Sequence, residues 1–346
     1  MANQSRLEIP LIFVYLGDDL PDYAVHSLKF AVNNSGCPVV LLASATNVPQ
    51  FDVSVNVVPI NSFYDSLEFQ SSRSDSLLDP NFWDGFWLKT TERFFVLREY
   101  VTKIRLNRFF HAELDNLVFS LKGISDGLDQ VGNGIFIPRD DENRAIASLL
   151  YVNDSSVLAL LCDFSTQKAV NFNDMEMLAS FLQEHPERAF GLPTSNSMWL
   201  EDRGSLKGSF TVVDEQIMGI FDGASFGQWL FGIDPRITGK IVRNRFINEK
   251  LRYDPRLLSF RLDLHRHELW VKWSGTDEIR LHNLHVHSKI HRRLSRTGAL
   301  ERFIAYNNKG KSVVISLNPF GAFRYFLGVI VYSLNFLTNR KAGNPK

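Results

Sequence analysis

The sequence predicts an α/β protein in which a mostly parallel central sheet is flanked by helices. Residues 9–17 are almost continuously apolar, which is typical of a strand buried on both faces of a sheet. Residues 23–34 carry apolar side chains at helical spacing, and a second apolar run follows at 38–43. Strand, helix and strand in quick succession are the opening of a doubly wound α/β layer.

The composition is that of an ordinary globular protein. The chain has 346 residues, of which 45% are hydrophobic and 22% are charged, and its formal net charge is +0. A chain without excess positive charge lacks the usual footprint of nucleic-acid binding, so we expect no nucleic-acid partner. Cys37 and Cys162 form neither a disulfide framework nor a C-x-x-C motif, and the first ten residues lack the apolar core of a signal peptide. We therefore expect a cytoplasmic location.

The first half continues the alternation of strands and helices. Its clearest helix is 86–103, because apolar side chains at helical spacing could fill one face. Lys89 and Arg93 lie four residues apart on another face of this helix. The remaining expected strands are 53–60, 134–138, 148–152 and 188–193, and the remaining expected helices are 125–130, 155–167 and 174–185, the last capped by Asn173 or Asp174. No G-x-G-x-x-G follows the first strand, so the dinucleotide-binding fingerprint is absent.

The second half opens with a loop at 195–208. A helix at 224–231 would aim its N-terminus, together with Asp222, at a cleft. The further expected elements are meandering strands over 252–273, a histidine-bearing strand within 278–289, a basic helix over 289–305 and a strand at 312–317.

The tail at 325–337 is largely apolar and is followed by Arg340 and Lys341. It is shorter than the roughly 20 residues that a membrane-spanning helix needs. Three alternatives stay open, namely a helix packed on the body, a partner-binding helix and a helix lying on the inner face of a membrane.

The predicted chemistry centres on 108–119, an apolar run interrupted by Glu113 and Asp115. Alternate residues of a strand share a side, so these carboxylates should project together from the end of the strand. Two such carboxylates can hold a hard divalent cation, and the cation can hold a diphosphate. The plain alternative is a surface strand that carries two acids.

A second cluster contains His282, His285 and His287 and ends at Lys289. On a strand, His285 and His287 would share a face, and Lys289 would extend it. Zinc sites usually gather four nitrogen or sulfur ligands at short spacings. No cysteine lies near, which disfavours a structural zinc site, and ordinary strand histidines are the other alternative.

These two patterns together resemble the metal-dependent GT-A glycosyltransferases, especially bacterial enzymes of polysaccharide and lipopolysaccharide assembly. Glu113-Leu-Asp115 looks like the D-x-D motif of that family, with Glu in place of the commoner first Asp. His285-Val-His-Ser-Lys289 looks like its late metal-binding histidine followed by a phosphate-binding cation. The resemblance implies a GT-A-like (Rossmann-like) fold with a nucleotide-sugar-binding half over 1–194, an acceptor-side half over 195–318 in the same continuous domain, and a C-terminal helix over 319–346.

The resemblance also implies an activity, a hexosyl- or deoxyhexosyl-transferase that moves sugar from a nucleotide-diphosphate-sugar to a glycan or lipid-linked glycan. Asp115 and either His285 or His287 would bind Mn²⁺ or Mg²⁺. The residues implied in nucleotide-sugar binding are Asp18 or its neighbour Asp19, Lys89, Arg93, Glu113 and Lys289. Asp222 would lie on the acceptor side, as general base if the enzyme inverts or as a residue that only positions the acceptor if the enzyme retains. The alternative is a turn residue before Gly223.

Two rival functions remain open from the sequence. A nucleotidyltransferase or sugar-nucleotide hydrolase would need a basic, Gly-rich loop after the first strand, where residues 17–21 are acidic. A non-catalytic glycan-binding protein on the same fold predicts no metal-dependent binding of a nucleoside diphosphate. For the cations Lys89, Arg93, Arg292, Arg293 and Arg296 the plain alternative is a solvated helix face, and the last three could also contact an anionic lipid-linked acceptor.

Overall fold

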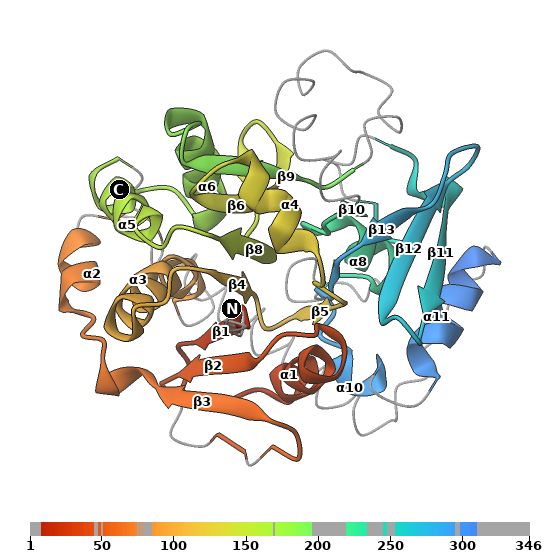
Figure 1. Ribbon diagram of the computed structural model, residues 1–346, viewed down its shortest axis with the longest axis horizontal. Coiled ribbons are helices and arrows are strands. Elements are labelled where there is room, and N and C mark those ends of the chain that lie inside the picture. The colour runs from red at the N-terminus through yellow and green to blue at the C-terminus, as the bar shows by residue number, and fades with distance from the viewer. Residues whose placement is uncertain are drawn as a thin grey trace, which may run out of the picture.

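The computed structural model describes residues 8–44, 48–49, 51–74, 76, 78, 85–168, 170–195, 219–233, 245–247, 253–294 and 298–309. The largest of its sheets has eight strands (Figure 1). Their order is β3 (Val55–Pro59), β2 (Val39–Ala43), β1 (Leu11–Tyr15), β4 (Phe109–Ala112), β8 (Leu149–Val152), β6 (Ile135–Asp141) and β7 (Arg144–Ala145), with β9 (Ala189–Pro193) also paired to β6.

Most strands of this sheet run in one direction. β3, β2, β1 and β4 pair in parallel. β8 is antiparallel to both β4 and β6, so β6 again runs with β4, and β9 is parallel to β6. The prediction of a mostly parallel central sheet is confirmed. The carboxyl ends of β1 and β4 consequently share one edge, where β1 is followed by Asp18 and β4 by Glu113.

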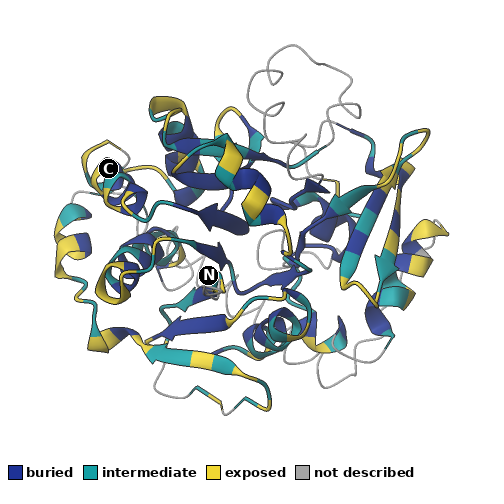
Figure 2. Ribbon diagram, viewed as in Figure 1, coloured by how far each residue is buried: buried dark blue, intermediate teal, exposed yellow. Residues whose placement is uncertain are grey.

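Helices cover both faces of the sheet, as predicted. One face packs against α1 (Asp22–Asn34) and α4 (Ile124–Val131), and the other against α3 (Phe86–Ile104), α5 (Val157–Gln167) and α6 (Asp174–Glu184). β1 shows why its sequence is continuously apolar, because Ile12 packs into one core and Phe13 into the other. Figure 2 shows these central strands buried, whereas the edge strand β3 is largely half-buried or exposed.

The remaining elements of the first half are short. α2 (Leu67–Ser72) and the 3-10 turn η1 (Ile60–Ser62) precede α3. Of the two caps expected for α6, Asn173 is the one used: its side chain accepts from the backbone N–H of Glu176 at 3.0 Å in a capping box.

A second, four-stranded sheet lies at the right of Figure 1. Its order is β10 (Gly219–Ile220), β13 (Ile279–Leu281), β12 (Glu268–Trp273) and β11 (Leu258–Asp263), the last preceded by the 3-10 turn η3 (Pro255–Leu257). α8 (Ser225–Phe231) and α11 (Ala299–Asn308) pack with this sheet around a core of their own. A two-stranded sheet formed by β5 (Asn116–Val118) and β14 (Asn283–His285) joins this part to the first.

One expected element of the second half is present and one prediction was wrong. A histidine-bearing strand does lie within 278–289, namely β14, but it ends at His285, so His287 is not on that strand. The basic stretch 289–305 is not one helix, because α10 (His291–Leu294) is separate from α11, which begins after Gly298 in the left-handed region (φ +66°). A chain in that conformation cannot continue a right-handed helix.

Several predictions fall outside the described residues. They concern the loop after residue 195, the strand at 312–317, Arg296 and the apolar tail at 325–337. The boundaries expected after residues 194 and 318 stay predictions. In the part of the chain that the structure describes, no helix has the length and apolar character needed to cross a membrane.

Candidate metal centre

The acidic pair lies in a turn that links the two sheets. β4 ends at Ala112, and the N–H of Asn116 donates to the carbonyl of Glu113 at 3.1 Å, which closes the turn before β5 begins. The two carboxylates are therefore brought together by a turn and not by the alternation of a continuous strand. Pairing of β5 with β14 sets His285 opposite Asn116, and the N–H of Val286 donates to the carbonyl of Asp115 at 2.8 Å.

Three side chains converge at this point. His285 Nε2 lies 3.1 Å from Asp115 Oδ1 and 3.3 Å from Glu113 Oε2, and all three candidate ligand atoms lie within 4.8 Å of one another. The other ring nitrogen, His285 Nδ1, lies 2.5 Å from the carbonyl oxygen of Gly223. A backbone partner of this kind fixes the orientation of a metal-binding imidazole, leaving its second nitrogen to face the ligand site.

The donor set fits a divalent cation. Carboxylate oxygens suit hard divalent ions, whereas an imidazole nitrogen suits ions of the first transition series. Mg²⁺ prefers an octahedron of oxygen ligands. Two oxygens and one nitrogen therefore fit Mn²⁺ better than Mg²⁺.

Cationic side chains surround the two carboxylates. Arg93 donates to Glu113 Oε1 at 2.6 Å and to Asp174 Oδ2 at 2.7 Å, and Lys289 forms an ion pair with Asp115 Oδ2. Burial by itself would raise the pKa of Asp115, but His285 and Lys289 outweigh it and hold that pKa well below its usual range. Burial likewise opposes a charged His285, but Asp115 and then Glu113 raise its pKa to about 9. Asp115 and His285 thus each favour the charged form of the other.

Asp222 lies directly behind His285. Its side chain is fully buried and accepts three backbone N–H bonds, from Phe226 at 3.0 Å, Gly227 at 2.7 Å and His285 at 2.9 Å. Burial raises the pKa of Asp222 to about 6 despite these bonds. A Cβ on Gly227 would lie 1.9 Å from the carbonyl oxygen of His285, so glycine is required for this close approach. Asp222 thus holds the start of α8 against β14, and its predicted catalytic role stays a prediction.

The other predicted residues are distributed around the same edge. Arg93, expected to meet phosphate, is buried in its bridge between Glu113 and Asp174. Asp18 is exposed after β1. Lys89 is half-buried, and no ion pair within the described residues joins it to the cluster. The nucleotide-binding roles expected of these residues stay predictions.

The structure separates the three histidines that the sequence grouped. His285 alone belongs to the convergent group with the carboxylates. His287 follows in the turn, with its ring centroid 4.1 Å from that of His285. His282 is fully buried on the other side of β14, with its ring centroid 4.9 Å from that of Phe221.

Sequence reasoning did not identify three residues that build the site. Asp174 was considered only as a helix cap, yet it shares Arg93 with Glu113. The ring centroid of Tyr23 lies 5.1 Å from Lys289 Nζ. Asn283 donates to Asn116 Oδ1 at 2.7 Å and accepts from the N–H of Asp222 at 2.9 Å. The sequence offered no distinct signal for Asn283, because it lies among alternating histidine and apolar residues.

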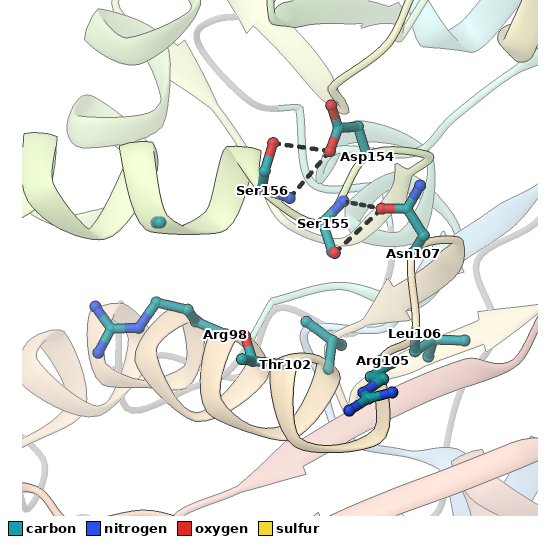
Figure 3. Close-up of a pocket in the computed structure, with 10 residues that line it drawn as sticks. Arg98, Thr102, Arg105, Leu106, Asn107, Asp154, Ser155 and Ser156 are labelled. Carbon is teal, nitrogen blue, oxygen red and sulfur yellow. Dashed lines mark hydrogen bonds between the residues drawn. The ribbon is translucent and has the colours of Figure 1, made fainter.

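A pocket lies at the opposite edge of the large sheet, between the end of α3 and the start of α5 (Figure 3). Asn107 in its wall precedes β4, whereas Glu113 follows that strand. Its polar groups bond one another: the N–H of Ser155 donates to Asn107 Oδ1 at 2.9 Å, and Ser156 Oγ donates to Asp154 Oδ1 at 2.8 Å. The pocket is therefore separate from the candidate metal centre.

Comparisons with known proteins give only distant likenesses. No protein-family model matches the chain, and no curated protein matches it. Mouse xyloside xylosyltransferase 1 in its apo form is similar over 60% of this chain and 93% of its own, with 10% identity and a TM-score of 0.37. GlyE of Streptococcus pneumoniae is similar over 53% of this chain and 45% of its own, with 13% identity and a TM-score of 0.34.

The bifunctional glycosyltransferase WbbM in its apo form is similar over 56% of this chain and 40% of its own, with 11% identity and a TM-score of 0.35. The matched region thus spans less than half the length of GlyE and of WbbM. All three proteins are glycosyltransferases by name. Likenesses with such TM-scores carry no argument about chemistry, which has to come from the residues of this chain.

Proposed function

We propose that this protein is a metal-dependent glycosyltransferase that moves a sugar from a nucleotide-diphosphate-sugar to a glycan or lipid-linked glycan. One observation carries the proposal. Ligand atoms of Glu113, Asp115 and His285 meet within 4.8 Å at the carboxyl edge of the parallel strands, which is where open α/β sheets bind their ligands.

In this proposal, some residues hold the cation and others position those ligands. Asp115 Oδ1, Glu113 Oε2 and His285 Nε2 hold the cation, which when bound supplies Lewis-acid stabilisation to the departing diphosphate. Arg93 holds the Glu113 carboxylate in place through their ion pair, and Asp222 fixes the backbone of His285.

The substrate side of the proposal follows the same edge of the sheet. Asp18, exposed beyond the end of β1, would contact the base and ribose of the donor. Lys289 and Lys89 would face its phosphates. Asp222 would lie on the acceptor side, behind His285.

The test is calorimetry with UDP, GDP, dTDP and CDP, each with and without Mn²⁺. We expect one nucleotide to bind in an Mn²⁺-dependent way. Asp115→Ala should abolish that binding, because it removes one of the three candidate metal ligands. The matched control is Asp277→Ala, since Asp277 is exposed in a turn after β12 and should leave binding unchanged.

Sugar transfer from the nucleotide so identified is then measured with glycan acceptors. An Asp115→Ala protein that folds and transfers sugar at the wild-type rate would refute the proposal. Release of free sugar with no use of any acceptor would instead indicate the sugar-nucleotide hydrolase.

A further inference from the structure

Lys289 occupies one of the two oxygens that the metal centre could use on Asp115. Its ammonium group pairs with Asp115 Oδ2, while Asp115 Oδ1 faces His285 Nε2 at 3.1 Å. The N–H of Lys289 donates to the carbonyl of Val286 at 3.0 Å, and its backbone is left-handed (φ +55°). A non-glycine residue rarely adopts this conformation, so the turn after β14 holds Lys289 at the site.

The surroundings of Lys289 provide a second place for its charge. The ammonium lies 5.1 Å from the centroid of the Tyr23 ring, within the range of a cation–π interaction. Tyr23 belongs to α1, which begins just after the exposed acidic segment at the end of β1. The Lys289 side chain is 27% exposed, whereas that of Asp115 is only 11% exposed. The Lys289 side chain therefore reaches solvent at the rim, whereas Asp115 is more deeply buried.

From this geometry we propose that Lys289 is a built-in counter-cation that competes with the divalent cation for Asp115. In the metal-free protein, Lys289 neutralises a carboxylate that would otherwise be buried with less compensation. When the cation binds, the ammonium leaves Asp115 Oδ2 and stays against the Tyr23 face. The inference rests on the proposed metal site and deepens it, because it couples binding of the cation to release of Lys289 from Asp115.

The competition predicts the direction in which the affinity for the cation changes when the charge of Lys289 is removed. A positive charge a few ångströms from the cation position, in a half-buried site, weakens cation affinity by a factor on the order of ten. Removing the charge should therefore tighten metal binding, which is the opposite of what loss of a supporting residue does. Lys289→Met keeps the length of the side chain without its charge, and Lys289→Arg keeps the charge.

The experiment measures the affinity of the full-length protein for Mn²⁺ alone, from the electron paramagnetic resonance signal of free Mn²⁺. We expect Lys289→Met to bind Mn²⁺ about tenfold more tightly than the wild type and Lys289→Arg to bind it within about twofold. Lys122→Met, at an exposed lysine before α4, is the matched control and should bind like the wild type. Thermal melting of each variant verifies that it is folded.

A second measurement uses the wild-type protein only. An amine-reactive acetylating reagent, read by mass spectrometry, should label Lys289 faster when Mn²⁺ is present, because the ammonium has left Asp115. Labelling of Lys122 should not change. Mn²⁺ binding with unchanged labelling of Lys289 would overturn the inference even if the variants were unfolded.

The outcomes distinguish this inference from the proposed function. If Asp115→Ala loses Mn²⁺ binding while Lys289→Met binds it no more tightly than the wild type, the competition is refuted and the metal site stands. If Asp115→Ala binds Mn²⁺ as the wild type does, the metal site itself is refuted, and the inference with it.

Discussion

Replacing Asn283 by alanine should both destabilise the protein and weaken its metal binding. Asn283 lies at the start of β14, two residues before His285, and is fully buried. Its amide donates to Asn116 Oδ1 at 2.7 Å and to the carbonyl of Asp222 at 3.0 Å, and its oxygen accepts from the N–H of Asp222 at 2.9 Å. One side chain thus connects β5, β14 and the segment that precedes α8.

The size of the effect follows from which groups lose their partners. Alanine would leave the N–H of Asp222 and Asn116 Oδ1 buried without these bonds, whereas the carbonyl of Asp222 keeps Ser148 Oγ at 2.7 Å. A buried polar group left unsatisfied costs about 1–3 kcal/mol. Two such groups predict a loss of about 2–6 kcal/mol in the free energy of unfolding.

Urea unfolding at pH 7 measures this loss, and Mn²⁺ binding measures its effect on His285. The matched control is Asn143→Ala, because Asn143 is exposed in the turn between β6 and β7; it should change stability by no more than about 0.5 kcal/mol. Asn283→Ala with an unchanged urea slope and a stability within about 1 kcal/mol of the wild type would refute this account of the amide network.

Two further predictions concern buried charges. Arg93→Met should lower the free energy of unfolding by about 3–5 kcal/mol, because the buried Asp174 and the half-buried Glu113 lose their shared cation. Urea unfolding measures this loss, and an equal loss in exposed Arg266→Met would contradict the buried-bridge argument. Burial and, to a smaller extent, the charge of Arg280 hold the pKa of His282 well below 6.5. The contribution of neutral His282 to the free energy of unfolding is therefore full above pH 6.5 and is lost as the pH falls. From pH 7 to 5 the wild type should lose about 2 kcal/mol more than His282→Leu, and equal losses would show that His282 is protonated in the folded state.

The first half of the fold could be predicted because its signals are local. Continuous apolar runs such as 11–15 and 39–43 arise where both faces of a strand are covered, and that condition is visible in the sequence itself. The end of β4 and its two acids were found for the same reason. The pairing of Asp115 with His285 was expected only through a family resemblance, and the ladder between β5 and β14 is what brings them together.

The second half was harder because its order depends on distant contacts. The helical pattern after residue 289 is divided between α10 and α11, and the left-handed Gly298 immediately precedes α11. Lys89 and Arg93 share a helix face in sequence, yet Arg93 is buried by Glu113 and Asp174, whereas Lys89 is not. Spacing gives the face of a helix, but the partners across the interface determine which charge is desolvated.

The three-residue pairing between β5 and β14 makes the candidate metal centre sensitive to the register of these strands. The centre is less sensitive to the length of the loops outside the pairing. Asn283, Leu284 and His285 pair with Val118, Leu117 and Asn116, and neighbouring side chains of a strand point to opposite sides. A one-residue shift in the register of β14 against β5 would therefore place Leu284 where the His285 imidazole lies and remove a ligand from the site. An insertion in the exposed connection between β12 and β13 should leave that alignment intact, whereas deletion of one residue inside the ladder should destroy it.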